Sequence, residues 1–245
     1  MVNSTYRHDS WLDAILQKTQ EQLGSPVNAC KWAGFYYLSS CPMFDMSISA
    51  GQHTPYTGEM DIVRRYINET GNKSCFVDVG AHIGTHSIPF SKMFSKVKSF
   101  EPCVENFSLL EKNVNINNCI NIQIHNTALS DDVRSASVFR HSDHNTGQHQ
   151  VVDDPNGSIE TATLDSYQFE NVDYIKIDVE GRELDVLKGA QETISLYRPL
   201  IQFEIPVMQE QYQSNLQEII EFLTYRNYEL YEEIHMDMFF RYMRK

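Results

Sequence analysis

The sequence predicts an α/β fold in which a mostly parallel sheet of seven strands carries helices on both faces. Short apolar runs alternate along the chain with stretches in which apolar residues recur at helical spacing. Such alternation requires crossover connections between parallel strands, and the crossover helices cover both faces of the sheet. The last two runs have no helix between them, which is typical of an antiparallel pair at a sheet edge. The seven expected strands comprise residues 75–79, 97–100, 120–125, 172–177, 200–205, 228–234 and 238–242.

The connecting segments show the spacing of amphipathic helices. Residues 209–225 give the clearest pattern, because Leu216, Ile219, Ile220 and Leu223 recur on one helical face. A helix at residues 10–23 ends before Gly24 and is expected to cover the sheet or to form a dimer contact. The remaining helices are expected at residues 59–69, 85–93, 104–117 and 183–196.

The first 70 residues are expected to form an N-terminal helical and β extension. Residues 31–38 read as a strand, with residues 46–50 as its hairpin partner. The helix at residues 59–69 comes directly before the first strand of the sheet, so we expect it to act as a lid over a ligand pocket. His53, in the loop that precedes this helix, is a candidate pocket residue.

The main domain, residues 71–245, contains one irregular insert at about residues 130–163. Two β-like runs lie within it, at residues 136–140 and 158–162. Its polar loop contains His141, Asp143 and His144, a spacing that can hold a divalent metal ion. A solvated loop explains these residues more simply, so no metal site is predicted.

The composition limits the classes of partner and the cellular compartment. Among 245 residues, 33 are acidic and 20 are basic, which gives a formal net charge of −13. Extended binding to a nucleic-acid backbone needs clustered cations, so nucleic acid is an unlikely partner. The five cysteines form no C-x-x-C pair, and no long apolar run begins the chain. These features favour reduced thiols in a cytoplasmic protein with neither a signal peptide nor a membrane span.

A strand that breaks at glycine and continues into a helix predicts a ligand-binding turn after the first strand. The dinucleotide pattern G-x-G-x-x-G fails here, because its third position is His82. The carboxylate of Asp78 would repel the diphosphate of a nicotinamide cofactor but attract the cationic groups of S-adenosylmethionine (SAM). Gly80 permits a positive φ and a close approach of the ligand. The residues expected to bind SAM at this turn are Asp78, Gly80, Ala81, His82, Gly84, Thr85 and His86.

The next two strands supply further candidates at the same edge of the sheet. Glu101 and Pro102 end the second strand, and a carboxylate there can accept hydrogen bonds from both ribose hydroxyls of an adenosine. Asn126 and Ala128 follow the third strand, where small and polar residues can flank an adenine ring. The alternative is an NAD-dependent oxidoreductase, but Asp78 and the failed glycine pattern argue against it.

Two carboxylates follow the fourth strand, where they are candidates for catalysis. Strand alternation would point Asp178 and Glu180 the same way, toward the reacting methyl group. They could bind a hydroxyl substrate, take its proton or hold a divalent metal. Glu204, at the end of the fifth strand, is a third acid on this edge. His53, His82 and His235 are the histidine candidates for the base.

Four motifs follow one another along the chain: residues 76–84 (FVDVGAHIG), 100–102 (FEP), 128–131 (ALSD) and 175–181 (IKIDVEG), with 186–190 (VLKGA) and 198–199 (RP) beyond them. In their residues and their order, these motifs resemble the FkbM-type methyltransferase family over roughly residues 75–206. The resemblance implies a class I methyltransferase (Rossmann-like) fold, SAM as the methyl donor and a hydroxyl oxygen as the usual acceptor. The sequence departs from the family at His82, His86 and Arg182, where asparagine, an aromatic residue and a small residue are common.

The resemblance therefore predicts a SAM-dependent O-methyltransferase that acts on a sugar, glycan or secondary metabolite. Methyl transfer would proceed by in-line displacement, so the protein must hold the acceptor oxygen near the methyl group and remove its proton. Glu180, Asp178 and His53 are the expected catalytic residues, and Asp178 is also expected to contact the cofactor. Two alternatives remain open: a nucleic-acid methyltransferase acting on an RNA cap or ribose, and a non-catalytic SAM-fold binding module.

Overall fold

The computed structural model describes residues 10–32, 34–41, 56–140, 146–204 and 210–243. Its centre is a seven-stranded sheet in which the strands from β11 to β5 are parallel and the edge strands β12 and β13 are antiparallel. The predicted mostly parallel sheet is confirmed. In spatial order the strands are β12 (Tyr228–Ile234), β13 (Asp237–Tyr242), β11 (Leu200–Glu204), β10 (Val172–Ile177), β3 (Cys75–Val79), β4 (Lys96–Phe100) and β5 (Ile122–His125).

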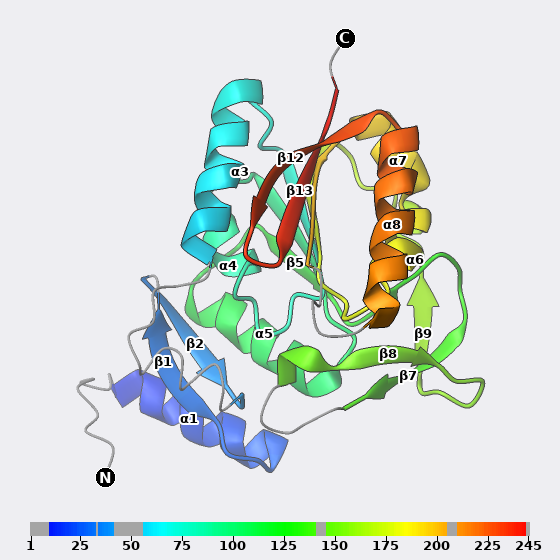
Figure 1. Ribbon diagram of the computed structural model, residues 1–245. Coiled ribbons are helices and arrows are strands. Elements are labelled where there is room, and N and C mark those ends of the chain that lie inside the picture. The colour runs from blue at the N-terminus through cyan, green and yellow to red at the C-terminus, as the bar shows by residue number, and fades with distance from the viewer. Residues whose placement is uncertain (1–9, 33, 42–55, 141–145, 205–209, 244–245) are drawn as a thin grey trace.

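Helices cover both faces of this sheet (Figure 1). On one face an aromatic layer fills the core, in which the rings of Phe76 and Tyr174 stack with their centroids 4.6 Å apart. The other face is mainly aliphatic, with Val77, Ile175 and Ile201 among its buried residues. The first face packs against α3 (Tyr56–Thr70), α4 (Ser87–Phe90) and α5 (Val104–Ile116), and the second against α6 (Glu183–Lys188), α7 (Gln191–Tyr197) and α8 (Glu210–Tyr225).

Two predicted helices are wrong in extent. The helix expected at residues 85–93 is only the four-residue α4, because the N–H groups of Lys92 and Met93 bond three residues back and continue the segment as turns. The helix expected at residues 183–196 is divided into α6 and α7 at Gly189. A Cβ atom at Gly189 would lie 1.9 Å from the carbonyl oxygen of Ser130, so a neighbouring backbone passes against this break.

The N-terminal unit consists of α1 (Ser10–Leu23), as predicted, and the antiparallel hairpin of β1 (Asn28–Trp32) and β2 (Phe35–Ser39). The single strand expected at residues 31–38 is wrong, because the chain turns at Gly34, whose φ is +88°. Its expected partner, residues 46–50, lies outside the described residues. Asn113 on α5 holds the hairpin in place, since its side chain bonds both the N–H and the carbonyl oxygen of Leu38.

The insert forms a sheet of its own beside the main sheet, at the lower right of Figure 1. Two of its strands, β7 and β9, were predicted with slightly different bounds, whereas β6 and β8 were not. Two 3₁₀ turns, η1 (Thr146–Gln148) and η2 (Asp165–Tyr167), flank its last two strands. The four strands, in spatial order, are β6 (Ala128–Leu129), β9 (Ile159–Ala162), β7 (Ser135–Phe139) and β8 (Gln150–Asp153).

All five cysteines are free thiols. Within the part of the chain that the structure describes, no helix has both the length and the apolar character needed to cross a membrane.

Candidate active site

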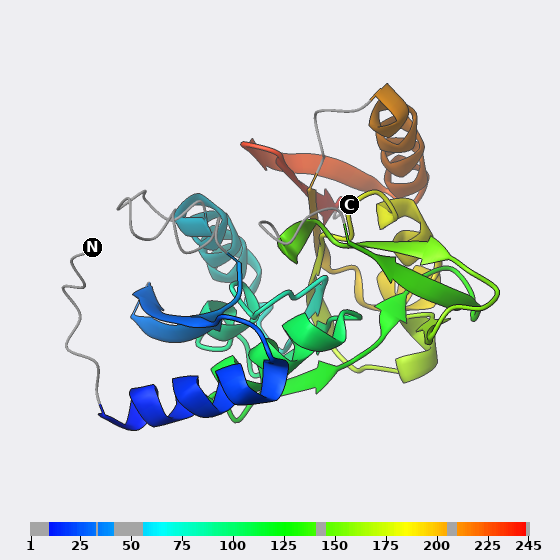
Figure 2. The same ribbon diagram turned by 90° about the horizontal axis from the view of Figure 1, so that it is seen from below.

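Four neighbouring strands bring the predicted site residues to one edge of the sheet. Because β10, β3, β4 and β5 are parallel neighbours, the residues that follow them gather at their common carboxyl end. Figure 2 looks toward this end from below and shows the N-terminal unit on one side of it and the insert on the other. The gathered residues are Asp78 and the glycine turn, Glu101, Asn126, Asp178 and Glu180.

The glycine turn is packed tightly against the end of β10. Gly80 has a φ of +84°, and a Cβ atom there would lie 1.8 Å from the carbonyl oxygen of Asp178. The N–H groups of Gly80 and Ala81 both donate to the carbonyl oxygen of Phe100, at 3.0 and 2.9 Å. The close approach that requires glycine is therefore made by the protein's own backbone, and the turn is fixed between two strand ends.

Asp78 is fully buried and keeps one oxygen unpaired. Its Oδ2 accepts a hydrogen bond from the Ser87 hydroxyl at 2.5 Å, and that hydroxyl also lies 2.7 Å from the Ser99 hydroxyl. Its Oδ1 is buried and has no hydrogen-bond partner among the described residues. An unpaired buried carboxylate oxygen is costly, so this atom suits a cationic donor such as the ammonium group of SAM.

Glu101 is buried at the end of β4, and its carboxylate accepts hydrogen bonds from the backbone of two segments. Its Oε2 accepts the N–H of His82 and its Oε1 the N–H of Cys103, both at 2.9 Å. Burial, which is only partly offset by these bonds, raises the pKa of Glu101 to about 7. The Asn106 side chain also bonds this carboxylate, which has about four acceptor positions in all, so Glu101 can still accept a hydrogen bond from a ribose hydroxyl.

His82 links the glycine turn to the insert. Its Nε2 lies 2.8 Å from the Thr146 hydroxyl, while Asn106 donates to the Thr146 carbonyl oxygen at 3.1 Å. Burial lowers the pKa of His82 to about 4, so its ring is neutral near pH 7. A neutral imidazole beside the glycine turn adds no repulsion against a cationic cofactor.

Lys176 supplies a buried positive charge that the sequence reasoning did not assign. Its Nζ lies 2.7 Å from Oδ2 of Asp178, and its side chain is only 2% exposed. Burial alone would lower the pKa of Lys176, but Asp178, Asp78 and Asp237 together raise it above its usual value. Lys176 in turn keeps the pKa of Asp178 below its usual value despite burial. The period of two along a strand could have identified this pair, since Lys176 lies two residues before Asp178.

A layer of buried polar side chains extends from Lys176 across the face of the sheet that packs against α3 and α4. Gln202 is its register neighbour and donates to Glu59 Oε2 at 2.9 Å and to Asp237 Oδ1 at 2.7 Å. His86, predicted to bind the cofactor, lies with its Nε2 2.8 Å from the same Glu59 oxygen. The layer therefore joins α3 and α4 to the sheet.

Glu180 lies just beyond the strand, so the alternation argument does not extend to it. β10 ends at Ile177, and Glu180 has a φ of +55°. Its carbonyl oxygen accepts a hydrogen bond from Gln150 of the insert at 2.9 Å. Burial, with the charges of Asp178 and Glu183, raises the pKa of Glu180 to about 7. The charge of Asp178 and burial likewise raise the pKa of Glu204 to about 8.

The family of the chain follows from comparison with known proteins. The model of the methyltransferase FkbM domain matches residues 78–230, which contain all of the carboxylates of this edge except Glu59 and Asp237. The protein belongs to the FkbM methyltransferase family. Its seven-stranded sheet with helices on both faces is the Rossmann-like fold of class I methyltransferases.

Two curated relatives and one solved structure are similar to this FkbM-family chain. The hexuronic acid methyltransferase AglP of Haloferax volcanii is 30% identical over 136 residues, 54% of this chain and 56% of that protein. Methyltransferase 1 of Beauveria bassiana is 24% identical over 147 residues, 49% and 59% of the two chains. The chain thus spans less than two thirds of either relative. The crystal structure of methyltransferase FkbM from Methylobacillus flagellatus KT has a TM-score of 0.49 and 20% identity, covering 70% of this chain and 44% of that one.

Three further residues of this FkbM-family chain were predicted to bind the cofactor: Asn126, Ala128 and Thr85. Asn126 donates to the carbonyl oxygens of Glu101 and Pro102, at 2.8 and 3.1 Å, and so joins the ends of β4 and β5. Ala128 is buried in β6 of the insert, and Thr85 is buried in the glycine turn. Their contacts with a cofactor stay predictions.

The structure leaves most of the histidine and metal hypotheses untested. His53, His141 and His144 lie outside the described residues. His235 occupies the turn between β12 and β13 with a φ of +55°. Within the described ranges, no group of three or more histidine, cysteine or acidic side chains is arranged to hold a metal ion.

Proposed function

We propose that the protein is a SAM-dependent O-methyltransferase whose acceptor is a hydroxyl group of a sugar or glycan. The observation that carries the proposal is the arrangement at one edge of an FkbM-family sheet. There, a buried carboxylate with one unpaired oxygen, Asp78, lies near the end of β10, where Glu180 has a pKa of about 7. The name of the relative AglP, a hexuronic acid methyltransferase, favours a sugar acceptor.

The residues present suit the cofactor. Oδ1 of Asp78 would accept a hydrogen bond from the ammonium group of SAM, and Glu101 would accept one from a ribose hydroxyl of SAM. Asn126 and Ala128 remain the candidates near the adenine ring. When bound, SAM supplies a methyl group attached to a positively charged sulfur atom.

The two acids after β10 would have different tasks. Asp178 is ion-paired with Lys176, which lowers its pKa, so it is a weak base that can position an acceptor hydroxyl by accepting its hydrogen bond. Glu180 has a pKa near 7 and is therefore the better group to take the hydroxyl proton as the oxygen becomes nucleophilic. His53 remains a predicted catalytic residue that lies outside the described residues.

The insert contacts two parts of the candidate site. Thr146 contacts His82, Gln150 contacts the backbone of Glu180, and Arg182 pairs with Asp153 of β8 at 2.7 Å. Through these three contacts the insert reaches both the glycine turn and the acids after β10. We infer that it contributes to acceptor specificity, and that residues before 71 contribute the lid.

Methyl transfer from labelled SAM tests the proposal. The protein is incubated with a neutral hexose, a hexuronic acid, an oligosaccharide and a capped RNA in parallel, and labelled products are identified by mass spectrometry. We expect a methyl ether on a sugar hydroxyl and no labelled RNA. Labelling of RNA alone, or binding of SAM without transfer to any hydroxyl compound, would contradict the proposal. Glu180→Gln protein serves as the control for background transfer.

A further inference from the structure

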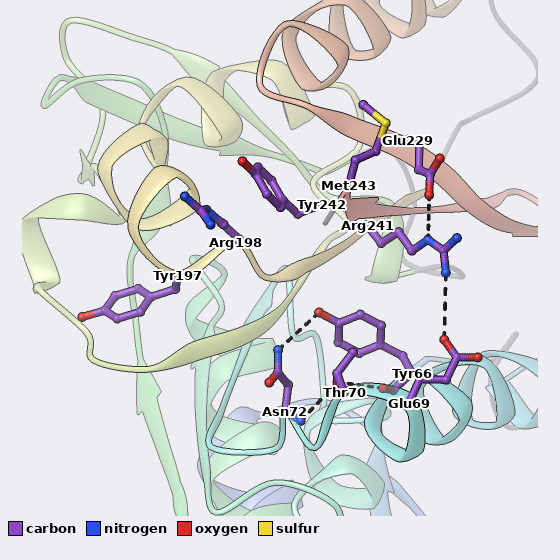
Figure 3. A pocket seen from close by; sticks show the side chains of 10 residues that line it. All are labelled: Tyr66, Glu69, Thr70, Asn72, Tyr197, Arg198, Glu229, Arg241, Tyr242 and Met243. Carbon is purple, nitrogen blue, oxygen red and sulfur yellow. Dashed lines mark hydrogen bonds and ion pairs between the residues drawn. The ribbon is translucent and has the colours of Figure 1, made fainter. Parts of the chain in front are cut away.

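A pocket of about 630 Å³ lies at the edge of the sheet where the parallel strands begin, away from the candidate active site (Figure 3). Its Arg241 lies between two carboxylates, with Nε 2.9 Å from Glu229 and Nη1 3.9 Å from Glu69. Arg198, the other arginine of the lining, is exposed to solvent. The charges of this pocket are therefore balanced or solvated. The opposite edge differs, because there the N-terminal unit meets the turn that is proposed to bind SAM.

The N-terminal hairpin packs against the glycine turn of the candidate site. Leu38 of β2 and Ile83 of the turn are fully buried in one apolar cluster. Tyr37 and Ala81 are buried together in a second cluster. Figure 1 shows the hairpin beside α5, and β2 is the strand in contact with that helix. The glycine turn therefore shares its packing with a segment that precedes the sheet.

Two asparagines of α5, one helical turn apart, bond the edge of β2 that faces away from β1. Asn117 accepts the N–H of Tyr36 at 2.8 Å and donates to its carbonyl oxygen at 2.6 Å. Asn113 accepts the N–H of Leu38 at 2.7 Å and donates to its carbonyl oxygen at 3.0 Å. A carboxamide group has two N–H donors, so each side chain has a second bond to give. Asn117 donates it within α5, to the carbonyl oxygen of Asn113, whereas Asn113 donates it to the carbonyl oxygen of Ile83 at 2.9 Å.

The bond to Ile83 holds the glycine turn at a strained point. His82, just before Ile83, has a φ of +51°, and Gly84, just after it, has a φ of +93°. A positive φ is unfavourable for a residue with a side chain and persists where the surrounding structure holds it. Glu101 supplies one such contact, to the N–H of His82, and Asn113 supplies the next, to the carbonyl oxygen of Ile83. Without the second contact, the turn could adopt other conformations.

We propose that Asn113 is a positioning residue for SAM, because one side chain fixes both the glycine turn and the N-terminal hairpin. Asn113 acts through Ile83 and the turn, and the inference rests on SAM binding at this edge, as in the proposed function. If only a fraction of the molecules holds the turn in its binding conformation, the observed dissociation constant rises by the inverse of that fraction. Coupling of this kind is reciprocal, so bound SAM should stabilise the docked hairpin at Leu38.

Calorimetry with SAM on the full chain compares Asn113→Leu with Asn117→Leu. Leucine has nearly the shape of asparagine but no hydrogen-bonding group, and each change removes three hydrogen bonds, two of them to β2. Both variants should therefore melt at a lower temperature than the unsubstituted protein. Only Asn113→Leu removes a bond to the glycine turn. We expect it to weaken SAM binding by roughly fivefold or more, and Asn117→Leu to change it by less than about twofold.

Hydrogen exchange of the unsubstituted protein gives a second measurement, which still applies if Asn113→Leu fails to fold. The N–H of Leu38 is bonded by Asn113 and that of Tyr36 by Asn117, so these two amides compare the two contacts within one molecule. SAM should slow exchange at Leu38 by roughly fivefold more than at Tyr36. Equal slowing at both amides would indicate general stabilisation and would overturn the proposal.

Equal SAM affinity of the two leucine variants would overturn the proposal as well. In either of these cases the unsubstituted protein still binds SAM, so the proposed methyl transfer is unaffected. If the unsubstituted protein binds no SAM at all, the proposed function fails and this inference fails with it.

Discussion

The Nε2 atom of His86 lies 2.8 Å from Oε2 of Glu59, and both side chains are buried. This contact joins the segment after the glycine turn to α3, the last helix before the sheet. The same Glu59 oxygen accepts a hydrogen bond from Gln202 of β11 at 2.9 Å. One buried carboxylate thus ties together three segments that lie far apart in the sequence.

Replacing Glu59 by alanine should destabilise the fold strongly. The change leaves the His86 ring and the Gln202 amide without their shared acceptor in a buried layer, a loss that typically costs roughly 3–5 kcal/mol of the free energy of unfolding. Asp61→Ala, on an exposed turn of the same helix, is the control and should cost about 0–1 kcal/mol. Urea titration of both variants measures the difference. Equal stability of the two variants would show that the buried contact contributes little.

Gly80→Ala should disrupt the glycine turn far more than a comparable change elsewhere. Gly80 combines a φ of +84° with a Cβ position 1.8 Å from the Asp178 carbonyl oxygen. Gly24 has a φ of +63° with nothing within 4 Å of its Cβ position, so Gly24→Ala isolates the backbone strain, about 1–2 kcal/mol. Thermal melting should show a much larger loss for Gly80→Ala, together with lost SAM binding. Similar melting temperatures would mean that the end of β10 moves aside easily.

The strands could be predicted because local patterns delimit them. The bounds of β3, β10 and β12 agree with the sequence prediction, since each is a short apolar or alternating run that ends in turn residues. The break between α6 and α7 could not be predicted, because Gly189 packs against the backbone of Ser130, nearly sixty residues away. The pairing of β1 with β2 was missed because the aromatic run appears continuous across Gly34.

The sequence also predicted one part of the candidate site and missed another. The rule that ligands bind at the carboxyl ends of parallel strands placed Asp78, Glu101 and Asp178 at one edge, where the structure has them. The polar layer beneath them depends on which strands are neighbours in the sheet, and the order of the strands cannot be read from local sequence patterns. Gln202 meets Lys176 through the β10–β11 register, and Asp237 reaches Gln202 only because the final hairpin folds back beside β11.

SAM binding should depend on two carboxylates from different strands. Asp78→Ala and Glu101→Gln should each weaken SAM binding by roughly tenfold or more, because each removes a charged hydrogen-bond acceptor. Calorimetry with SAM measures the loss, and NAD tested alongside should not bind. Asp61→Asn, at an exposed site, is the charge-matched control. Unchanged SAM affinity in both site variants would contradict the assignment of the cofactor to this edge.

Glu204 should make the protein less stable at high pH. Its pKa is about 8 in the folded protein, above the usual value of 4.5, mainly because of the charge of Asp178. The folded state therefore holds this proton more tightly, and its stabilising contribution is complete below pH 4.5 and lost as the pH rises through about 8. Glu204→Gln, which mimics the protonated acid, should raise the melting temperature at pH 8.5 but not at pH 5, by roughly 2–4 °C for each kcal/mol gained. An equal change in melting temperature at both pH values would show that ionisation of Glu204 is not the cause.

The turnover of the proposed reaction should rise with pH through about 7, because Glu180 must be ionised to accept the hydroxyl proton. Glu101 also has a pKa of about 7, but it acts on cofactor affinity, so saturating SAM removes its effect from kcat. Below that pH, kcat should fall tenfold per pH unit, since the ionised fraction falls by that factor. Glu180→Gln should reduce kcat by roughly 100-fold or more and abolish this dependence, while SAM affinity is retained. A kcat that is constant from pH 5.5 to 8, or a Glu180→Gln protein that keeps the pH dependence, would transfer the role of base to another group.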